Sequence, residues 1–201
     1  MIKKIQIIFI VFTFYLTSIS FSEEENYKII KLINNHVITN YDLEMRLQLF
    51  SFLNNVSINA KNIDQYASEM LKLMSDEKLQ LDHINKYQIE INSGEVNKYI
   101  TRAILKPEQT ISDFEIELNI NNVNFEILKE SIRIQLGWNE LSGRLFFRTV
   151  EITDIDLTDI MKKNVSLSED QARNIIIQNQ IGLRATKLLR DLRVEANIEN
   201  R

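Results

Sequence analysis

Tyr27–Phe50 has the sequence YKIIKLINNHVITNYDLEMRLQLF, in which two short apolar runs flank a pair of asparagines. Lys28–Ile33 alternates polar and apolar side chains closely enough to predict a β-strand, and Asn34-Asn35 is typical of a tight turn. Val37-Ile38 can then return as a second strand beside the first. The stretch therefore predicts a β-hairpin, followed directly by an amphipathic helix.

Helical periodicity dominates the rest of the chain. One proline and four glycines in 201 residues leave few positions that interrupt a helix. Thr39 can cap the first helix, with the Asp42 carboxylate near the positive end of the helix dipole. Later helices are predicted, in chain order, at Ile63–Tyr87, at Glu95–Leu105, after a capping box at Ser112–Glu115, from Asn124 towards Phe147, at Asp156–Met161, and from a capping box at Ser168–Gln171 to Val194. The predicted fold class is mainly α, a multi-helical domain with a small N-terminal β-hairpin and a docked C-terminal helix.

Residues 1–22 are predicted to be a signal peptide that is removed on secretion. Lys3 and Lys4 form a basic start, Ile5–Leu16 is an almost unbroken apolar run, and cleavage is expected after Ser22. The alternative is a retained membrane anchor, but a spanning helix needs roughly 20 apolar residues and this run is shorter. The mature chain is therefore expected in the periplasm, without stable membrane insertion.

Composition limits the classes of function. The chain has 24 Lys and Arg against 28 Asp and Glu, for a formal net charge of −4. The predicted signal carries two of those lysines and no acid, so the mature chain is more acidic still. Such a protein is not expected to bind nucleic acid or anionic lipid as its main partner. Because the chain has no cysteine, disulfides and thiolate chemistry are excluded.

No pattern typical of catalysis is found in the sequence. Its two histidines, His36 and His83, are predicted to lie in a turn and on a helix surface, whereas a metal site or a general base needs several groups that converge. Nucleophile elbows, phosphate-binding loops and metal-ligand spacings are absent from the sequence. The sequence therefore predicts a protein that is not an enzyme and holds no cofactor or metal.

Glu77 is the acidic residue that stands out. Met70, Met74 and Glu77 follow a helical spacing that places the carboxylate within an apolar seam. An unpaired charge in such a seam is costly, so one interpretation is an ion pair with Arg46 or Arg133. The other interpretation is a polar anchor inside a peptide-binding groove.

Phe146, Phe147, Met70 and Met74 are further candidates for peptide binding. Adjacent residues on a helix cannot both face one core, so the phenylalanine pair should place one ring towards the surface. Methionine side chains adapt to varied partners and can line a binding surface. The alternative is that all four residues simply fill the core. Together with Glu77 they form the predicted peptide-binding site.

Four segments, in the same order along the chain, resemble motifs of the SurA family of periplasmic chaperones. They are a hairpin with the start of a helix, a segment of the long helix, a short segment that ends in tryptophan, and a closing segment: Leu32–Arg46 (LINNHVITNYDLEMR), Leu71–Leu81 (LKLMSDEKLQL), Gln135–Trp138 (QLGW) and Leu192–Glu199 (LRVEANIE). The resemblance covers the whole mature chain. It implies the N-terminal domain of that family, with the C-terminal helix docked back on it.

The chain departs from the family in its middle. SurA-family members typically carry one or two parvulin-type prolyl isomerase domains between the N-terminal domain and the closing helix. Here only Thr149–Lys163 separates the two parts, whereas a packed domain needs roughly 50 residues or more. Residues 23–163 are therefore expected to form the chaperone domain. Residues 164–201 are expected to complete it with a helix and a short strand, Ala196–Glu199, added to the hairpin.

The resemblance implies an ATP-independent holdase that binds unfolded segments of outer-membrane proteins and assists their folding or assembly. Without an isomerase domain, the chain is expected to act as a chaperone only. Two alternatives stay open, because fold alone does not determine function. One is a periplasmic scaffold that binds a single folded partner, and the other is a peptidyl-prolyl isomerase.

Overall fold

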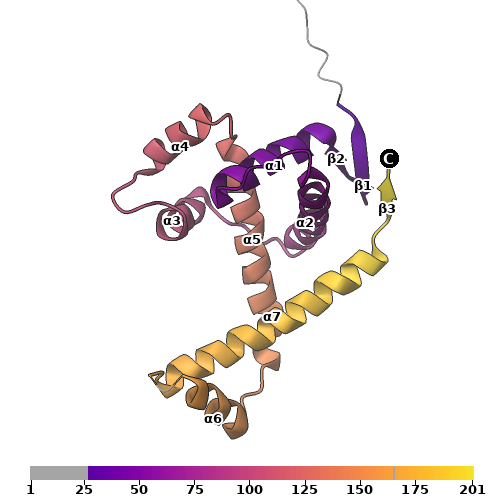
Figure 1. Ribbon diagram of the computed structural model, residues 1–201. Helices are drawn as coiled ribbons and strands as arrows, with labels where there is room; N and C mark the ends of the chain where they lie inside the picture. Colours follow the sequence, from indigo (N-terminus) through magenta and orange to yellow (C-terminus); the bar gives the residue numbers. More distant parts are fainter. Residues whose placement is uncertain (1–26, 165) are drawn as a thin grey trace, which may run out of the picture.

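Seven α-helices and a three-stranded sheet make up the described part of the chain, residues 27–164 and 166–201 of a computed structural model (Figure 1). In chain order the elements are β1 (Ile29–Ile33), β2 (His36–Thr39), α1 (Asn40–Asn54), α2 (Ile63–Lys86), α3 (Ser93–Ala103), α4 (Ile111–Ile120), α5 (Phe125–Phe146), a 3-10 turn η1 (Phe147–Thr149), α6 (Asp154–Lys163), α7 (Glu169–Glu195) and β3 (Ile198–Asn200). The predicted mainly α fold class is confirmed. The predicted signal peptide lies outside the described residues.

β1 and β2 pair antiparallel, as the sequence predicts, and Asn34 makes the turn between them with a left-handed φ of 51°. Asparagine tolerates this conformation better than most residues, which explains the asparagine pair. Thr39 then caps α1, as predicted. Its hydroxyl oxygen accepts from the Asp42 backbone N–H at 3.1 Å, and its own backbone N–H donates to the Asp42 carboxylate at 2.8 Å. These bonds fix the corner between the hairpin and the helix.

The C-terminal strand joins the same sheet. β3 pairs antiparallel with β1, so the strand order is β2-β1-β3 and Leu32 lies opposite Glu199. The Asn34 backbone N–H donates to the Asn197 carbonyl at 2.8 Å, and the Asn197 backbone N–H donates to the Asn34 side chain at 3.1 Å. The predicted addition of a C-terminal strand to the hairpin is confirmed, with the strand at residues 198–200 rather than 196–199.

α5 runs through the middle of the helical part and contributes to two hydrophobic cores (Figure 1). The first core lies under the sheet, where α2, α5 and α7 meet, and includes the fully buried Ile33, Ile38 and Leu141. The second lies between α1, α3, α4 and α5 and includes the fully buried Ile100 and Leu118. Because α5 contributes side chains to both cores, this helix connects them.

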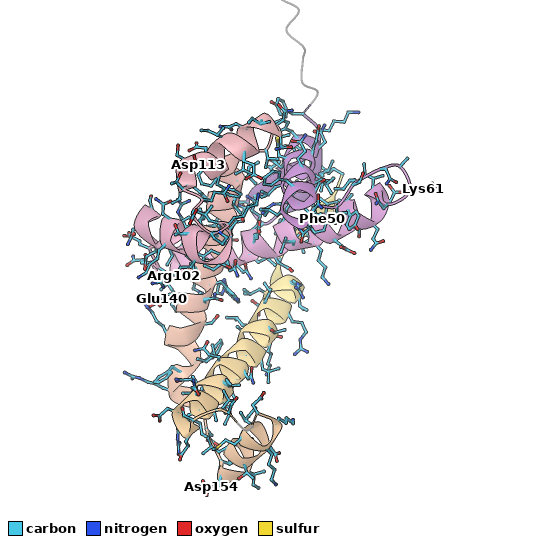
Figure 2. All side chains as sticks on the ribbon, turned by 60° about the vertical axis from the view of Figure 1, so that its left-hand side comes forward. Phe50, Lys61, Arg102, Asp113, Glu140 and Asp154 are labelled. Carbon is cyan, nitrogen blue, oxygen red and sulfur yellow. The ribbon has the colours of Figure 1, made fainter. Side chains whose placement is uncertain are left out.

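α6 and the first half of α7 extend away from the other helices, as the position of Asp154 in Figure 2 shows. A third, small core holds them together, with Leu157 of α6 against Ile176 of α7. The second half of α7 returns to the first core. There Arg193 donates two hydrogen bonds to the Asp76 carboxylate of α2, at 2.6 and 2.7 Å. α7 thus links the sheet to the small α6 unit.

Three helices begin earlier than predicted. α3 starts at Ser93 rather than Glu95, because Asn92 and Glu95 form its capping box, and it ends at Ala103 rather than Leu105. α4 starts two residues early, because Thr110 and Asp113 form its capping box in place of Ser112 and Glu115. α6 is longer than the predicted short helix, because Thr153 opens it with a capping box of its own. All three corrections concern which of several nearby polar side chains accepts the first free N–H groups of a helix.

Gly137 and Gly182 both lie within long helices, but their surroundings differ. A Cβ at Gly137 of α5 would lie 3.1 Å from the Ile84 side chain, because α2 approaches α5 closely there. Nothing in the described part of the chain lies within 4 Å of a Cβ at Gly182 of α7. We expect Gly182→Ala to raise the free energy of unfolding by about 0.5–1 kcal/mol, and Gly137→Ala to lower it by about 1–3 kcal/mol. Urea denaturation measures both, and a change of the same sign in the two variants would contradict the expectation.

Candidate functional site

An apolar cleft of about 500 Å³ opens between α1, α2, α3 and α5. Side chains from all four helices line it, among them Phe50 (labelled in Figure 2), Leu53, Met70, Leu73, Tyr99 and Trp138. Leu53 and Leu73 are 41% and 44% exposed, so they form a rim. Met70 and Trp138 are buried and form the deeper part. The cleft thus presents apolar surface at two depths.

Helical spacing brings these side chains together. Phe50 and Leu53 are three residues apart on α1, and Met70 and Leu73 are three apart on α2, so each pair lies on one face of its helix. Phe50 also contacts Tyr66 of α2, with ring centroids 5.1 Å apart. The cleft is therefore built on packed helices, which hold its shape better than loops would.

An ion pair lies in the wall of the cleft. Arg46 of α1 donates a hydrogen bond to the Glu77 carboxylate of α2, and the two side chains are only 12% and 11% exposed. Burial raises the pKa of Glu77, and the Arg46 charge opposes that rise. The Arg46 Nε–H group is buried without a partner in the described part of the chain. The predicted ion pair is confirmed with Arg46, whereas Arg133 pairs with Glu130 instead.

No protein-family model matches the chain. Curated proteins do match it: Chaperone SurA of Buchnera aphidicola subsp. Schizaphis graminum is 26% identical over 203 residues, which is 92% of this chain and 46% of that protein. The chain is similar to the SurA chaperones. Chaperone SurA of Hydrogenovibrio crunogenus is 24% identical over 84% of this chain and 38% of its own length, and that of Saccharophagus degradans is 22% identical over 67% and 32%. This chain spans less than half the length of the SurA proteins that it matches.

Two of the five predicted site residues, Met70 and Glu77, lie in the cleft. Met74 lies instead in the core under the sheet, and Phe146 packs, half-buried, against that same core. Phe147 is 60% exposed and lies just beyond α5. The five residues therefore do not meet in one place, because the side chains of a helix divide among its faces. Peptide binding by any of them stays a prediction.

Among the cleft-lining side chains outside the five predicted residues are Leu53, Leu73 and Tyr99. Leu53 and Leu73 each lie three residues beyond Phe50 or Met70, so an argument from helix faces can find them. Tyr99 reaches the cleft from α3, whose position depends on long-range packing. No local signal in the sequence predicts that contact.

The two histidines contact neighbouring side chains of the fold, His36 with Asp82 and His83 with Tyr87. His36 Nε2 lies 2.7 Å from Asp82 Oδ1 of α2, and Asn34 Nδ2 donates to the other Asp82 oxygen at 3.1 Å. Burial opposes ionisation of Asp82, but these hydrogen bonds outweigh it and lower the Asp82 pKa. Partial burial, together with the Lys86 charge, lowers the pKa of His83. The hydrogen bonds to Asp82 thus hold the hairpin turn against α2.

Within residues 27–164 and 166–201, no group of three or more His, Cys, Asp or Glu side chains could hold a metal ion. No helix within these ranges is both long and apolar enough to cross a membrane.

Proposed function

We propose that this protein is an ATP-independent chaperone of the periplasm that holds unfolded segments of outer-membrane proteins. The observation that carries the proposal is the apolar cleft, whose rim leucines stay exposed to solvent between packed helices. Apolar surface kept open in this way is typical of a binding site. The relationship to proteins named Chaperone SurA supports the same function.

The cleft suits reversible capture of a client. Each Å² of apolar surface removed from water stabilises the contact by roughly 25 cal/mol, with no need for nucleotide or covalent chemistry. Ordering the client chain offsets much of that gain, so single contacts stay weak. A client leaves when its own folding buries the same apolar surface.

We also propose that this stretch works without an isomerase domain. Between α5 and α7 the described residues form only η1 and α6, whereas a packed domain needs roughly 50 residues or more. Residues 23–163 then form the chaperone domain, and residues 164–201 complete it. The pairing of β3 with β1 and the packing of α7 against the first core support this division.

Aggregation of an unfolded outer-membrane protein on dilution from urea, followed by light scattering, tests the proposed function. The chain from residue 23 onward should suppress the aggregation. Leu53→Gln combined with Leu73→Gln should weaken the suppression several-fold, because both side chains lie on the rim of the cleft. The matched control, Ile155→Gln with Leu183→Gln, changes residues that are 74% and 73% exposed on α6 and α7 and should leave the suppression unchanged.

Each alternative predicts a different result. No suppression by the unaltered chain would contradict the chaperone function and favour a scaffold that binds one folded partner. Equal losses in the cleft variant and its control would contradict the role of the cleft. Turnover of a proline-containing peptide in an isomerisation assay would contradict the absence of an isomerase.

A further inference from the structure

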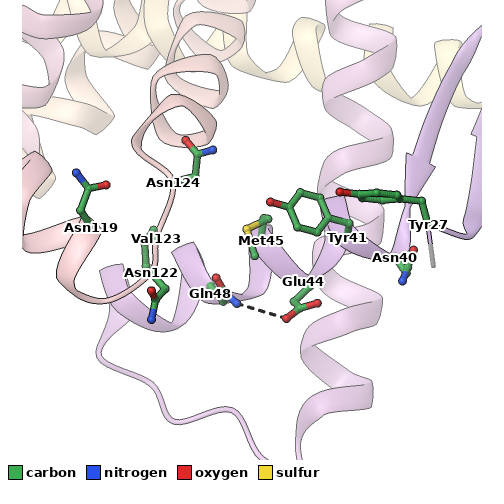
Figure 3. Close-up of a pocket in the computed structure, with 10 residues that line it drawn as sticks. All are labelled: Tyr27, Asn40, Tyr41, Glu44, Met45, Gln48, Asn119, Asn122, Val123 and Asn124. Carbon is green, nitrogen blue, oxygen red and sulfur yellow. Dashed lines mark hydrogen bonds between the residues drawn. The ribbon is translucent and has the colours of Figure 1, made fainter. Parts of the chain in front are cut away.

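α1 borders a second open region besides the apolar cleft. A polar hollow of about 810 Å³ lies between the first turns of α1 and the turn that joins α4 to α5 (Figure 3). Its lining combines side-chain amides with a carboxylate and an aromatic ring: Tyr41, Glu44, Gln48, Asn119, Asn122 and Asn124. Among the described residues that line this hollow there is no lysine or arginine.

A second hollow, of about 920 Å³, continues the first along α1. It lies against Ser51 of α1 and Asn121, the residue just after α4. The two hollows share no lining residue, but Ser51 follows Gln48 by about one helical turn and Asn121 is next to Asn122, so their linings are neighbours along the same two segments. We call the two together the amide trough. The 15 residues of α1 span about 22 Å, which matches an extended chain of about six or seven residues.

The floor of the amide trough is apolar. The rings of Phe52 and Phe114 lie with their centroids 6.2 Å apart, and Phe114 is buried. Val123, which also lines the first hollow, is buried and lies next to Asn122 (Figure 3). Apolar groups below and amides on the walls suit a ligand that carries both apolar and hydrogen-bonding groups along its length.

Several hydrogen-bonding groups of the trough lack a partner in the described part of the chain. The exposed side chains of Asn119 and Asn122 form no hydrogen bond there. Gln48 Oε1 is buried without a donor. Asn124 Oδ1 accepts from the Glu126 backbone N–H at 2.8 Å, which leaves its NH₂ group open. These groups include both donors and acceptors. Because a polar group without a partner is costly when water is displaced, they favour a ligand that supplies the missing partners.

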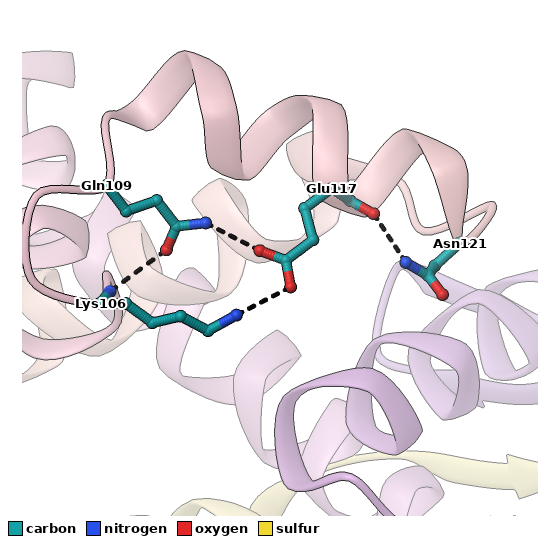
Figure 4. A network of polar contacts seen from close by, with 4 residues as sticks. All are labelled: Lys106, Gln109, Glu117 and Asn121. Atoms are coloured by element: carbon teal, nitrogen blue, oxygen red, sulfur yellow. Dashed lines mark hydrogen bonds and ion pairs between the residues drawn. The ribbon is translucent and has the colours of Figure 1, made fainter.

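The cation of the trough is already paired. Lys106 Nζ donates to the Glu117 carboxylate at 3.0 Å, and Gln109 Nε2 donates to its other oxygen at 2.7 Å (Figure 4). These hydrogen bonds lower the pKa of Glu117. The described lining therefore offers no unpaired cation for a phosphate or carboxylate ligand. A neutral ligand that both donates and accepts hydrogen bonds fits the trough better.

We propose that the amide trough binds the main chain of an extended client segment, while the apolar cleft takes client side chains. The inference rests on the proposed chaperone function. Side-chain amides match peptide groups, since both carry N–H donors and a C=O acceptor. Main-chain contacts are the same for every sequence, so a trough of this kind lets one protein hold unrelated clients.

Fluorescence anisotropy on the mature chain tests the inference with two labelled heptapeptides, one of alternating threonine and valine and one of alternating serine and leucine. Gln48→Met with Asn119→Ala should weaken the binding of both peptides by a similar factor, about tenfold or more, because the lost bonds go to the main chain. The matched control, Asn97→Ala with Asn139→Ala, removes two exposed amides outside the trough and should leave both affinities unchanged. Versions of the peptides methylated at alternate backbone nitrogens should bind the unaltered chain weakly. Their affinity should fall little further in the trough variant.

The outcomes separate this inference from the proposed function. Each of three results would overturn the inference and leave the proposed function standing. The first is unchanged affinities in the trough variant, and the second is a loss of affinity for one peptide only. The third is no peptide binding while aggregation is still suppressed. Chitohexaose serves as a carbohydrate probe. If it binds the unaltered chain but not the trough variant, and the peptide affinities stay unchanged, the trough is a sugar site. No peptide binding together with no suppression would overturn both proposals. Asn119 is exposed, so Asn119→Ala alone supplies a folded variant if Gln48→Met disturbs α1.

Discussion

A chain that ends at Asn164 is expected to lose the cooperative thermal transition of the full chain. Truncation removes α7 and β3, and with them the buried Ala185 and Leu192 and the half-buried Leu188 from the core under the sheet. A fully buried leucine contributes about 1.5–3 kcal/mol and a half-buried one less, so with the other contacts of α7 and β3 the total loss approaches the net stability of a typical domain, about 5–15 kcal/mol. The truncation also leaves Asp76, whose side chain is 13% exposed, without the Arg193 guanidinium.

Differential scanning calorimetry measures this effect. The matched control is a chain that ends at Ala196, which keeps α7 and the Arg193–Asp76 ion pair but lacks β3. It should still unfold in one transition, at a lower temperature than the full chain. An unchanged melting temperature after truncation at Asn164 would show that α7 does not complete the core.

Glu77→Leu is expected to lower the free energy of unfolding by about 3–5 kcal/mol. The substitution leaves the Arg46 charge in a site where the side chain is 12% exposed and one N–H already lacks a partner. Removal of both charges avoids that cost, so Arg46→Met with Glu77→Leu should restore stability to within about 1 kcal/mol of the unaltered chain, or exceed it. Urea denaturation at pH 7 measures all three proteins. A loss below about 1 kcal/mol in the single variant would contradict the burial of the pair.

The pH dependence of stability gives a second measure of Glu77. Burial raises its pKa above the ordinary value of 4.5, so folding favours the protonated form. The stability that this group contributes is therefore complete below pH 4.5 and is lost as the pH rises through the raised pKa. The Arg46→Met, Glu77→Leu double variant should lack this part of the slope. An identical slope in both proteins would assign it to other carboxylates.

Local signals predict the parts of the fold that depend on neighbouring residues. The Asn34-Asn35 turn and the Thr39 cap need only side chains within a few positions, and both are found as predicted. The start of α4 shows where such signals fail. Thr110–Asp113 and Ser112–Glu115 are both acceptable capping boxes two residues apart, and nothing within the segment decides between them.

The cleft depends on packing that neighbouring residues do not encode. By sequence, Arg46 and Arg133 are equal partners for Glu77. The structure selects Arg46 because α1 packs against that face of α2, while Arg133 pairs with Glu130 on its own helix. Met74 is absent from the cleft for a similar reason, since it faces the core under the sheet rather than α1. Helix faces can be predicted from spacing, but which helix covers each face cannot.

The sheet needs both ends of the described chain. Asn34 and Asn197 are hydrogen-bonded to each other across 163 positions of sequence. Contacts of such long range give a high contact order and form slowly, and the pairing of β1 with β3 cannot be complete before residue 200 has been synthesised. Until then, one edge of β1 carries unpaired backbone groups that can pair with other extended chains. During its own biosynthesis, the protein therefore presents the kind of vulnerable edge that a holding chaperone protects.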